Sequence, residues 1–258
     1  MKFSEVKGCE NLTVMFAKFT KSEHAQDLLD GNLYMNNFKH FVKQEENSKH
    51  KGQGDSYEGA FVTTFDAVDI YVNDGYAGYA QSGKISMTYT DLDRSPLFSM
   101  SMLKSCDFKV IEDKGSSIVL KVDFSEQDIK EFKENFKSDT VVFTLNFKTL
   151  IERLNDAARK TETKRVTGPV EYVDFSIMDS KHKDRYKRFE EGYIDFLFHK
   201  HNSLKYQREF RLILPDIQVD RNYTFEVGSL EDIFYVVDID EFFSGMKIEL
   251  GLKKANSI

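Results

Sequence analysis

Tryptophan is absent from this chain of 258 residues, and proline and cysteine are scarce, with 3 and 2 residues respectively. The two cysteines, Cys9 and Cys106, are too few for a disulfide framework or a four-cysteine metal site, so we expect a reducing compartment, the cytoplasm. No apolar run reaches the roughly 18 residues that a membrane-spanning helix requires. The N-terminal residues also lack the apolar stretch and cleavage site of a secretory leader. These absences argue against a disulfide-rich extracellular domain and predict a protein without membrane association.

The signatures of several common enzyme classes are missing as well. The chain has no glycine-rich phosphate loop, no dinucleotide-binding glycine pattern, no H-E-x-x-H zinc motif and no serine-hydrolase elbow. His199 and His201 form a close histidine pair, but they stand two residues apart without an evident third ligand. We therefore interpret the segment around Lys200 as a solvated polar turn and predict no metal site.

The balance of charge is acidic, with 43 Asp and Glu against 36 Lys and Arg and a net charge of −7. Such a chain is poorly suited to binding nucleic acid without regard to sequence, because that binding needs a cationic surface. One stretch of this acidic chain is basic, and it contains Lys181, Lys183, Arg185, Lys187 and Arg188. We expect either a local cationic patch for RNA, DNA or a nucleotide phosphate, or the solvated face of a helix.

Aromatic residues are abundant, with 23 Phe and 12 Tyr, which is typical of a core that mixes strands and helices. Strands are predicted over 12–19, 32–35, 60–72, 84–90, 96–103, 108–112, 117–124, 141–145, 170–175, 210–214 and 232–237. Helices are predicted from a capping box at 20–23 to Gly31, after the N-cap Ser125 over 126–137, over 147–159 and over 180–198. Because these elements lack a βαβ rhythm, we predict an α+β fold of mainly antiparallel sheets with flanking helices. One domain over 1–258 is the simplest count, with a long flexible loop near 42–59.

The most informative stretch lies toward the C-terminus, where polar and apolar residues alternate. Gln207, Glu209 and Arg211 share one face of a predicted strand. Phe210 and Leu212 point to the opposite face, toward the core. Three polar side chains on one face of an internal strand line a cleft, whereas on an exposed sheet face they meet solvent. The alternation is compatible with both arrangements.

The same stretch resembles part of a known family. Gln207-Arg208-Glu209 resembles the Q/E-x-E signature of ADP-ribosyltransferases. The wider chain resembles an uncharacterised bacterial family of ADP-ribosyltransferase-like domains with a K…E-x-E-x-R pattern. The matching pieces are short and extend over nearly the whole chain. In chain order they are residues 31–36, Phe41, Glu45, Asp55, Glu58-Gly59, residues 97–101, residues 170–172, Lys200, Gln207-x-Glu209-x-Arg211 and residues 246–251.

The resemblance implies a fold, a substrate and a set of site residues. The fold is a split pair of antiparallel sheets that binds NAD in a cleft, and the acceptor is a macromolecule, either protein or nucleic acid, in a setting such as phage–host conflict. The resemblance assigns Glu209 to the nicotinamide-ribose 2′-hydroxyl and to the oxocarbenium-like centre, where a carboxylate offsets charge that grows in the transition state. It assigns Gln207 to orienting the acceptor. The residues it implies for NAD binding are Ser99, Ser101, Tyr34 and Arg211.

One position departs from the family pattern. Active members carry His or Arg in the first strand, whereas this chain offers only Lys18, which we expect to be an exposed surface residue. The alternative function is therefore a non-catalytic interaction or regulatory protein of the inhibitor type. Such a protein would bind a protein or nucleic-acid partner through its charged surfaces.

Overall fold

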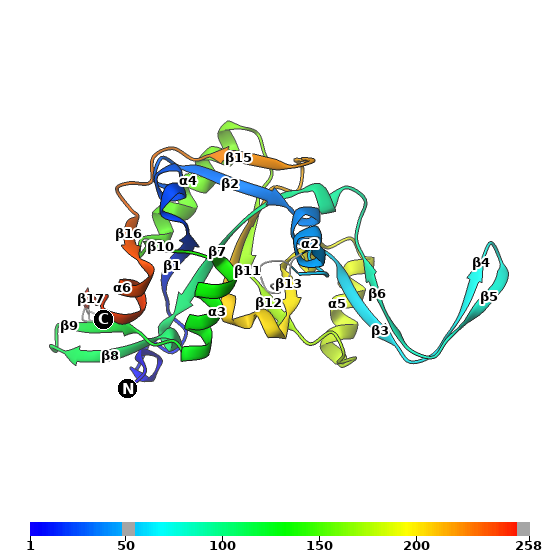
Figure 1. Cartoon of the computed structure of the whole chain (residues 1–258), viewed down its shortest axis with the longest axis horizontal. Helices are drawn as coiled ribbons and strands as arrows, with labels where there is room; N and C mark the ends of the chain where they lie inside the picture. Colours follow the sequence, from blue (N-terminus) through cyan, green and yellow to red (C-terminus); the bar gives the residue numbers. More distant parts are fainter. Residues whose placement is uncertain (48–54, 252–258) are drawn as a thin grey trace, which may run out of the picture.

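The computed structural model describes residues 1–47 and 55–251, and its centre is an antiparallel sheet that branches at β7 (Pro96–Lys104) (Figure 1). The strand order along the main path is β11-β14-β7-β1-β10-β16, and β2 joins β7 beside β1 and carries β15 on its other edge. The other strands of this sheet are β1 (Thr13–Thr20), β2 (Asn32–Asn37), β10 (Thr140–Thr144), β11 (Val166–Pro169), β14 (Glu209–Ile213), β15 (Asn222–Glu226) and β16 (Tyr235–Asp238).

The sheet splits along one edge of β7. On the other edge β14 pairs continuously, from Ile213 opposite Leu97 to Glu209 opposite Ser101. On the splitting edge β1 pairs with residues 101–104 of β7, whereas β2 pairs only with residues 96 and 97. Among the described residues, 98–100 therefore have no strand partner on this edge. β1 and β2 diverge at these residues, and the space between the two strands is a candidate location for a binding site.

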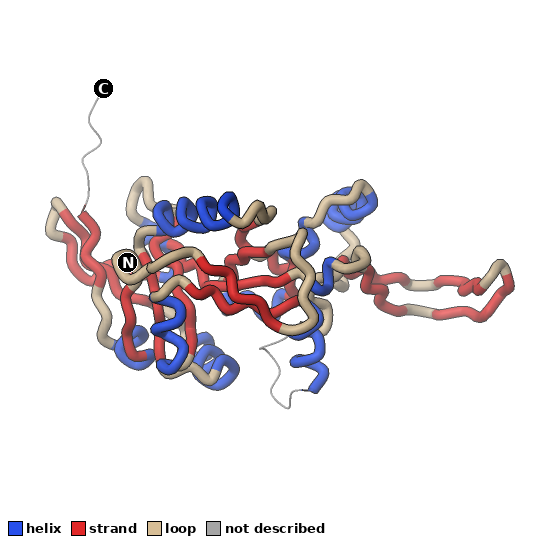
Figure 2. Tube along the Cα trace, turned by 90° about the horizontal axis from the view of Figure 1, so that it is seen from above, coloured by secondary structure: helices blue, strands red, loops and turns tan. Residues whose placement is uncertain are grey.

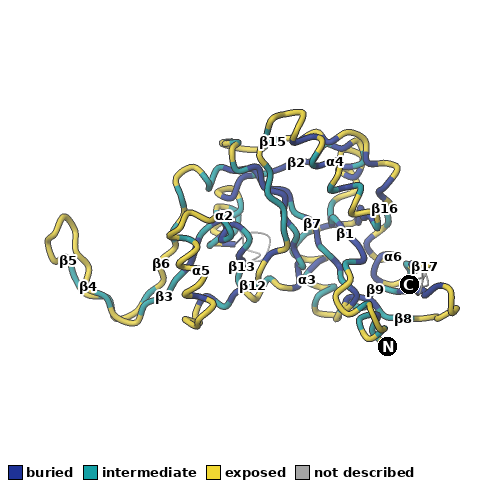
Figure 3. The backbone as a smooth tube through the Cα atoms, turned by 180° about the vertical axis from the view of Figure 1, so that it is seen from behind, coloured by how far each residue is buried: buried dark blue, intermediate teal, exposed yellow. Residues whose placement is uncertain are grey.

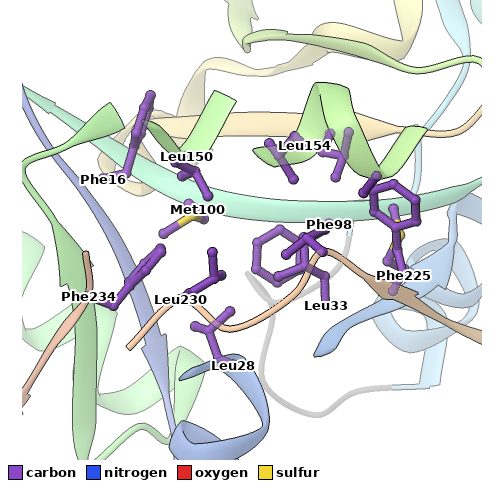
Figure 4. Packing of buried hydrophobic residues seen from close by; sticks show 14 of the residues in the cluster. Phe16, Leu28, Leu33, Phe98, Met100, Leu150, Leu154, Phe225, Leu230 and Phe234 are labelled. Atoms are coloured by element: carbon purple, nitrogen blue, oxygen red, sulfur yellow. The ribbon is translucent and has the colours of Figure 1, made fainter. Parts of the chain in front are cut away.

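One face of the sheet is covered by α4 (Phe147–Lys160) and the short α1 (Ala25–Leu29). Leu150 and Leu154 of α4 pack with Phe16 of β1 and Phe98 of β7 in one buried cluster (Figure 4). The apolar residues of α4 recur every three to four positions, so they form one stripe along the helix that the sheet buries. This stripe explains why an otherwise charged segment is helical and fixed in place.

The other face carries a second core that is rich in phenylalanine. It lies beneath α3 (Glu126–Phe136) and α6 (Ile239–Ser244), beside a three-stranded sheet. Phe19 of β1 stacks on Phe132 of α3 with ring centroids 4.1 Å apart, and it meets Phe242 of α6 edge-on. Within β1, Phe16 enters the first core, whereas its neighbours Met15 and Ala17 enter the second, as strand alternation requires. The three-stranded sheet consists of β8 (Phe108–Asp113), β9 (Ser117–Val122) and β17 (Ile248–Gly251).

The remaining elements surround one end of the central sheet. α2 (Phe38–Asn47) and α5 (Ser180–Glu190) lie there, with the parallel pair β12 (Glu171–Val173) and β13 (His199–His201). Short 3-10 helices connect the elements: η1 (Phe3–Glu5), η2 (Ser22–His24), η3 (Leu92–Arg94), η4 (Ser105–Asp107), η5 (Asp195–Phe198) and η6 (Asn202–Gln207). None of the helices within 1–47 and 55–251 is long and apolar enough to cross a membrane.

A two-stranded arm projects from this end, at the right of Figure 1 and again in Figure 2. Its root is the pair β3 (Phe61–Phe65) and β6 (Gly83–Met87), and its outer part is the pair β4 (Val68–Val72) and β5 (Gly75–Ala80). The outer part is exposed almost throughout (Figure 3). The four short strands thus form one long hairpin with a break in the pairing.

The fold confirms the predicted α+β class with mainly antiparallel sheets and flanking helices. The predicted hairpin over 108–124 is present as β8 and β9. The predicted N-cap is also confirmed, because the Ser125 hydroxyl oxygen accepts a 3.0 Å hydrogen bond from the Asp128 amide.

Several predicted local structures are wrong. The expected capping box at 20–23 is a 3-10 turn without a side-chain cap, because β1 runs on to Thr20. The expected loop near 42–59 begins as helix, since α2 continues to Asn47; residues 48–54 lie outside the described residues. The expected strand over 60–72 is interrupted at residues 66 and 67, and the expected helix over 180–198 ends at Glu190. Most of these errors concern an end or interruption of an element, where periodicity carries little information, whereas α2 was missed as a helix.

Candidate functional site

A cavity of about 590 Å³ lies where the sheet splits, and we refer to it as the split-sheet cavity. Its wall includes residues of β1, β2, β7 and α1, together with the N-terminal end of β14. Charged and hydroxyl groups in the wall stand beside aromatic and aliphatic ones. The polar lining residues include Lys18, Glu58, Ser99, Ser101, Lys200, Gln207 and Glu209. This volume lies in the usual range of small-molecule sites.

The centre of the polar wall is the carboxylate of Glu209. Its Oε1 accepts a 2.5 Å hydrogen bond from Ser99 Oγ and a 2.8 Å bond from Arg211 Nε. Its Oε2 accepts a 2.9 Å bond from Lys200 Nζ. Arg211 and Lys200 also form ion pairs with Glu58, so the two carboxylates share the same two cations. We call Lys18, Glu58, Lys200, Glu209 and Arg211 the charge cluster.

Strand register explains why these groups meet. In the antiparallel pairing of β14 with β7, Glu209 stands opposite Ser101 and Arg211 opposite Ser99. Because alternate residues of a strand share a face, Glu209 and Arg211 project together beside the two serines. Leu212 projects to the other face and is buried in the first core. The predicted alternation is therefore correct over β14.

Gln207 is not on the strand, contrary to the predicted alternation. It ends η6, and Arg208 then adopts a left-handed backbone conformation with φ of 50°. The Arg208 guanidinium is held by Asp107 at 2.6 Å and by Asp128 at 2.9 Å. Ser101 Oγ donates a 2.7 Å hydrogen bond to the Gln207 carbonyl and helps to fix the turn. The turn still brings the Gln207 side chain to the cavity, where its Oε1 accepts from Lys200 Nζ at 2.8 Å.

The two lysines of the charge cluster are not where the sequence predicted them. Lys18, expected to be an exposed surface residue, is partly buried and lines the cavity. Its Nζ donates a 2.7 Å hydrogen bond to the Ser99 carbonyl, which belongs to the stretch of β7 between the partners β1 and β2. The same Nζ lies 4.7 Å from the centre of the Phe98 ring. Lys200, expected in a solvated polar turn, is buried in β13. The turn interpretation fails because β13 is enclosed by its pairing with β12 and by the charge cluster.

The ionisation of the cluster follows from burial and from its ion pairs. Burial alone raises the pKa of a carboxyl, but Arg211, Lys200 and the hydrogen bond from Ser99 together hold the pKa of Glu209 well below its usual range. Burial raises the pKa of Glu58 above its usual value, against the attraction of Arg211 and Lys200. Burial lowers the pKa of Lys18 to about 8, and Glu209 opposes this shift. Glu209 is therefore ionised near neutral pH, and Lys18 is the cation whose charge changes most readily.

Of the other predicted site residues, Tyr34 lines the cavity, whereas Arg211 and the basic stretch do not. Tyr34 lies at the cavity on β2, with 56% of its surface exposed. Arg211, predicted to contact NAD, is 0% exposed and stands behind Glu209 rather than in the cavity wall. The predicted basic stretch lies on α5, away from the cavity lining. Within it, Arg185 pairs with Glu171 at 3.2 Å.

Sequence reasoning assigned no role to Glu58 or Lys18, and none to Tyr172. Glu58 and Gly59 were quoted only as part of a family pattern. Gly59 has a φ of 71°, and a Cβ there would lie 2.8 Å from the Phe38 ring, so glycine allows the chain to turn Glu58 inward. Tyr172 accepts a 2.8 Å hydrogen bond from the Glu209 amide through its hydroxyl oxygen. The Glu58-Gly59 pair was the one available signal, since glycine after a buried acid indicates a constrained turn.

Neither protein-family models, nor curated proteins, nor solved structures give a match to this chain. The His199 and His201 pair does not extend to a metal site, because no group of three or more potential ligands occurs within 1–47 and 55–251.

Burial next to the charge cluster makes His199 a source of acid sensitivity. Burial, helped by Arg185 and Arg211 and opposed by Asp195, lowers the pKa of His199 to about 4. Unfolded histidine has a pKa of about 6.5, so protons bind the unfolded chain preferentially as pH falls from about 6.5 to about 4. We expect this residue to lower the free energy of unfolding by up to about 3 kcal/mol across that interval. Urea unfolding at a series of pH values should detect the loss in the wild type and a smaller loss in His199→Gln. An equal reduction in His201→Gln would contradict the assignment to His199.

Proposed function

We propose that the split-sheet cavity binds NAD and that Glu209 is the catalytic residue of ADP-ribosyl transfer to a macromolecular acceptor. The observation that carries the proposal is the Glu209 carboxylate, held by Ser99, Arg211 and Lys200 in the wall of a cavity of about 590 Å³. The activity itself comes from the family resemblance, and the geometry supplies a residue able to perform the central step.

The hydrogen bonding of Glu209 leaves room for a ligand. A carboxylate has about four lone-pair positions. Ser99 and Arg211 occupy the two on Oε1, and Lys200 occupies one on Oε2. Within residues 1–47 and 55–251, one acceptor position on Oε2 remains, and a ribose 2′-hydroxyl is a donor suited to it. The three protein donors also fix the orientation of the carboxylate before the ligand arrives, which favours catalysis by electrostatic stabilisation.

The proposed reaction exchanges one bond to the ribose for another. The bond between ribose C1′ and the nicotinamide nitrogen breaks, and its electron pair leaves with neutral nicotinamide. The positive charge that develops at C1′ lies beside the Glu209 carboxylate, which attracts it most strongly in the transition state. The nucleophile of the acceptor then forms its bond to C1′ and releases its proton to solvent. Gln207, which lines the cavity, is the residue we assign to orienting that acceptor.

The charge of the cluster favours a phosphate-bearing ligand. Lys18, Lys200 and Arg211 supply three cations, whereas Glu58 and Glu209 supply two carboxylates. The raised pKa of Glu58 further reduces the negative contribution. A net positive charge beside a cavity attracts anions, and a pyrophosphate is an anion of suitable size. Exposed Tyr34 adds an aromatic face on which a base can stack.

A non-catalytic binding protein is the second candidate. The observation in its favour is that Glu209 already has two cationic partners, at 2.8 Å and 2.9 Å, as a purely structural carboxylate would. A protein of this kind would keep the cavity and the ion pairs without turning over a ligand. The two candidates differ in whether the bond to nicotinamide is broken.

The deciding experiment is incubation of the full chain with NAD labelled in the adenylate part, with and without mixed cellular protein and RNA. Transfer predicts release of nicotinamide, measured by chromatography, together with label on a macromolecule. Binding of NAD without nicotinamide release would favour the non-catalytic candidate. Absence of both binding and release would overturn the proposal.

Lys18 provides a separate test of the ligand class. We expect Lys18→Gln to weaken the binding of ADP-ribose about tenfold at neutral pH, because one charge-assisted contact is lost. In the wild type, affinity should fall as pH rises past about 8, where the Lys18 amine loses its proton. Isothermal titration calorimetry on both proteins at several pH values measures this. Lys130→Gln, which removes an exposed lysine of α3, is the matched control. Equal affinity of the Lys18 variant and the wild type would contradict a phosphate contact.

A further inference from the structure

The outer part of the arm exposes several large apolar side chains to solvent. β4 and β5 pair only with each other within the described residues, and isolated two-stranded hairpins are marginally stable. Tyr71 and Tyr76 meet edge-on at the tip, and each remains 62% exposed. The large exposed apolar residues of the outer arm are Ile70, Tyr71, Val72, Tyr76 and Tyr79. The three tyrosines share one face of the ribbon, and Ile70 and Val72 point to the other. Exposed apolar side chains of this size on one face indicate an interaction surface.

The arm is also acidic. Asp66, Asp69 and Asp74 lie along it, and no Lys, Arg or His occurs between residues 55 and 83. The surface that binds it must therefore combine positive charge with exposed apolar groups.

The face of α5 has both properties. The helix contains five basic residues against two acidic ones in SKHKDRYKRFE. Lys183 and Lys187, one helical turn apart, are exposed on one side of it, and Lys187 also pairs with Glu191 at 3.8 Å. The exposed apolar residues on and beside the helix are Ile177, Met178, Tyr186 and Tyr193. This α5 face is thus the chemical complement of the outer arm.

The two surfaces lie at opposite ends of the same arm. α5 packs on the root, where the Phe61 ring lies 5.4 Å from His182 and 5.2 Å from Phe189. The tip at Asn73 is about eight residues beyond Phe65, or roughly 26 Å of extended strand. The tip of a straight hairpin does not reach the helix at its own root. A second molecule placed antiparallel to the arm brings each tip to the other root.

We propose that this protein forms a two-fold symmetric dimer in which the outer arm of each copy lies on the α5 face of the other. The two arms run antiparallel, with the symmetry axis near their midpoints, and Asp69 and Asp74 of one copy face Lys183 and Lys187 of the other. The same contact occurs twice, as an isologous interface requires. The exposed tyrosines of the arm are buried against the apolar residues around α5. This inference does not depend on NAD binding.

A charge-exchange experiment on the full chain tests the arrangement. Sedimentation velocity over a wide range of protein concentration should give a dimer for the wild type. Asp69→Lys/Asp74→Lys and Lys183→Glu/Lys187→Glu should each raise the dimer Kd at least about tenfold, because like charges then face each other. The protein carrying all four substitutions should regain the dimer.

Two further variants complete the test. Glu112→Lys/Asp113→Lys reverses two acidic residues on the unrelated β8–β9 hairpin and should leave the dimer unchanged. Tyr71→Ser/Tyr76→Ser should dissociate it without a change in charge. Circular dichroism establishes that the exposed substitutions leave the fold intact. A wild type that is monomeric at every concentration overturns the proposal, as does a fourfold variant that fails to regain the dimer.

Discussion

Replacing Glu209 with glutamine is expected to lower the rate of nicotinamide release from NAD by about 10²–10³-fold. Glutamine has nearly the same shape, so the loss reports the charge. Without the carboxylate, Lys200 and Arg211 keep only Glu58 as a shared partner. In the proposed reaction, the positive charge that develops at the ribose then meets excess positive charge instead of an anion. Nicotinamide release under saturating NAD measures the effect on the chemical step.

Because Glu209 is buried in ion pairs, folding must be controlled. Asp232→Asn removes another salt-bridged carboxylate, which pairs with Arg153 at 2.6 Å and does not line the cavity. This variant should retain the wild-type rate. The Glu209 variant should keep the wild-type circular dichroism spectrum and should still bind ADP-ribose. A folded Glu209→Gln protein that releases nicotinamide at the wild-type rate would exclude Glu209 as the catalytic residue.

The part of the site that could be predicted is the part that lies on one strand. Alternation within Glu209–Ile213 fixed which residues share a face, and register with β7 then placed Glu209 and Arg211 beside Ser99. Alternation failed at Gln207, because the left-handed Arg208 interrupts the extended chain one residue before the strand begins. A non-glycine residue with positive φ has no reliable sequence signature.

The remaining parts of the site depend on contacts between distant segments. Glu58 reaches Arg211 from 153 residues away. Lys18 is enclosed because β1 and β2 diverge on β7, which no local pattern reveals. Burial of Lys200 was missed for a related reason, since polar residues are usually exposed unless they are paired, and its partners lie on other segments. Sequence patterns thus predicted which residues share a face of a strand, but not which distant segments cover that face.

The helix α2 was missed because its apolar residues are confined to its first turns. Phe38 is buried and Phe41 packs against the same cluster, but the residues after Val42 are polar. A short apolar stretch followed by charged residues is equally typical of a loop. The order of strands in the sheet could not be predicted from the sequence either, because β7 pairs with three different strands, β14, β1 and β2, along its two edges.

Replacing Arg211 with methionine is expected to destabilise the fold by about 3–5 kcal/mol, the cost typical of removing one partner from a buried ion pair. Arg211 is 0% exposed, and its guanidinium also donates to the Leu197 carbonyl. Without Arg211, the buried carboxylates of Glu58 and Glu209 keep Lys200 as the cation that pairs with both of them. Urea unfolding at neutral pH measures the change in free energy.

A double-mutant cycle with Glu58→Gln tests whether the loss arises from unpaired charge. Removing both partners leaves less uncompensated charge than removing one, so the double variant should lose clearly less stability than the sum of the single losses. Arg153→Met, which breaks a surface pair with Asp232, should cost no more than about 1 kcal/mol. Strict additivity in the cycle, or equal losses for Arg211→Met and Arg153→Met, would contradict the coupled cluster. With a non-additive cycle, the ion pairs that orient Glu209 would also be those that hold this end of the sheet together.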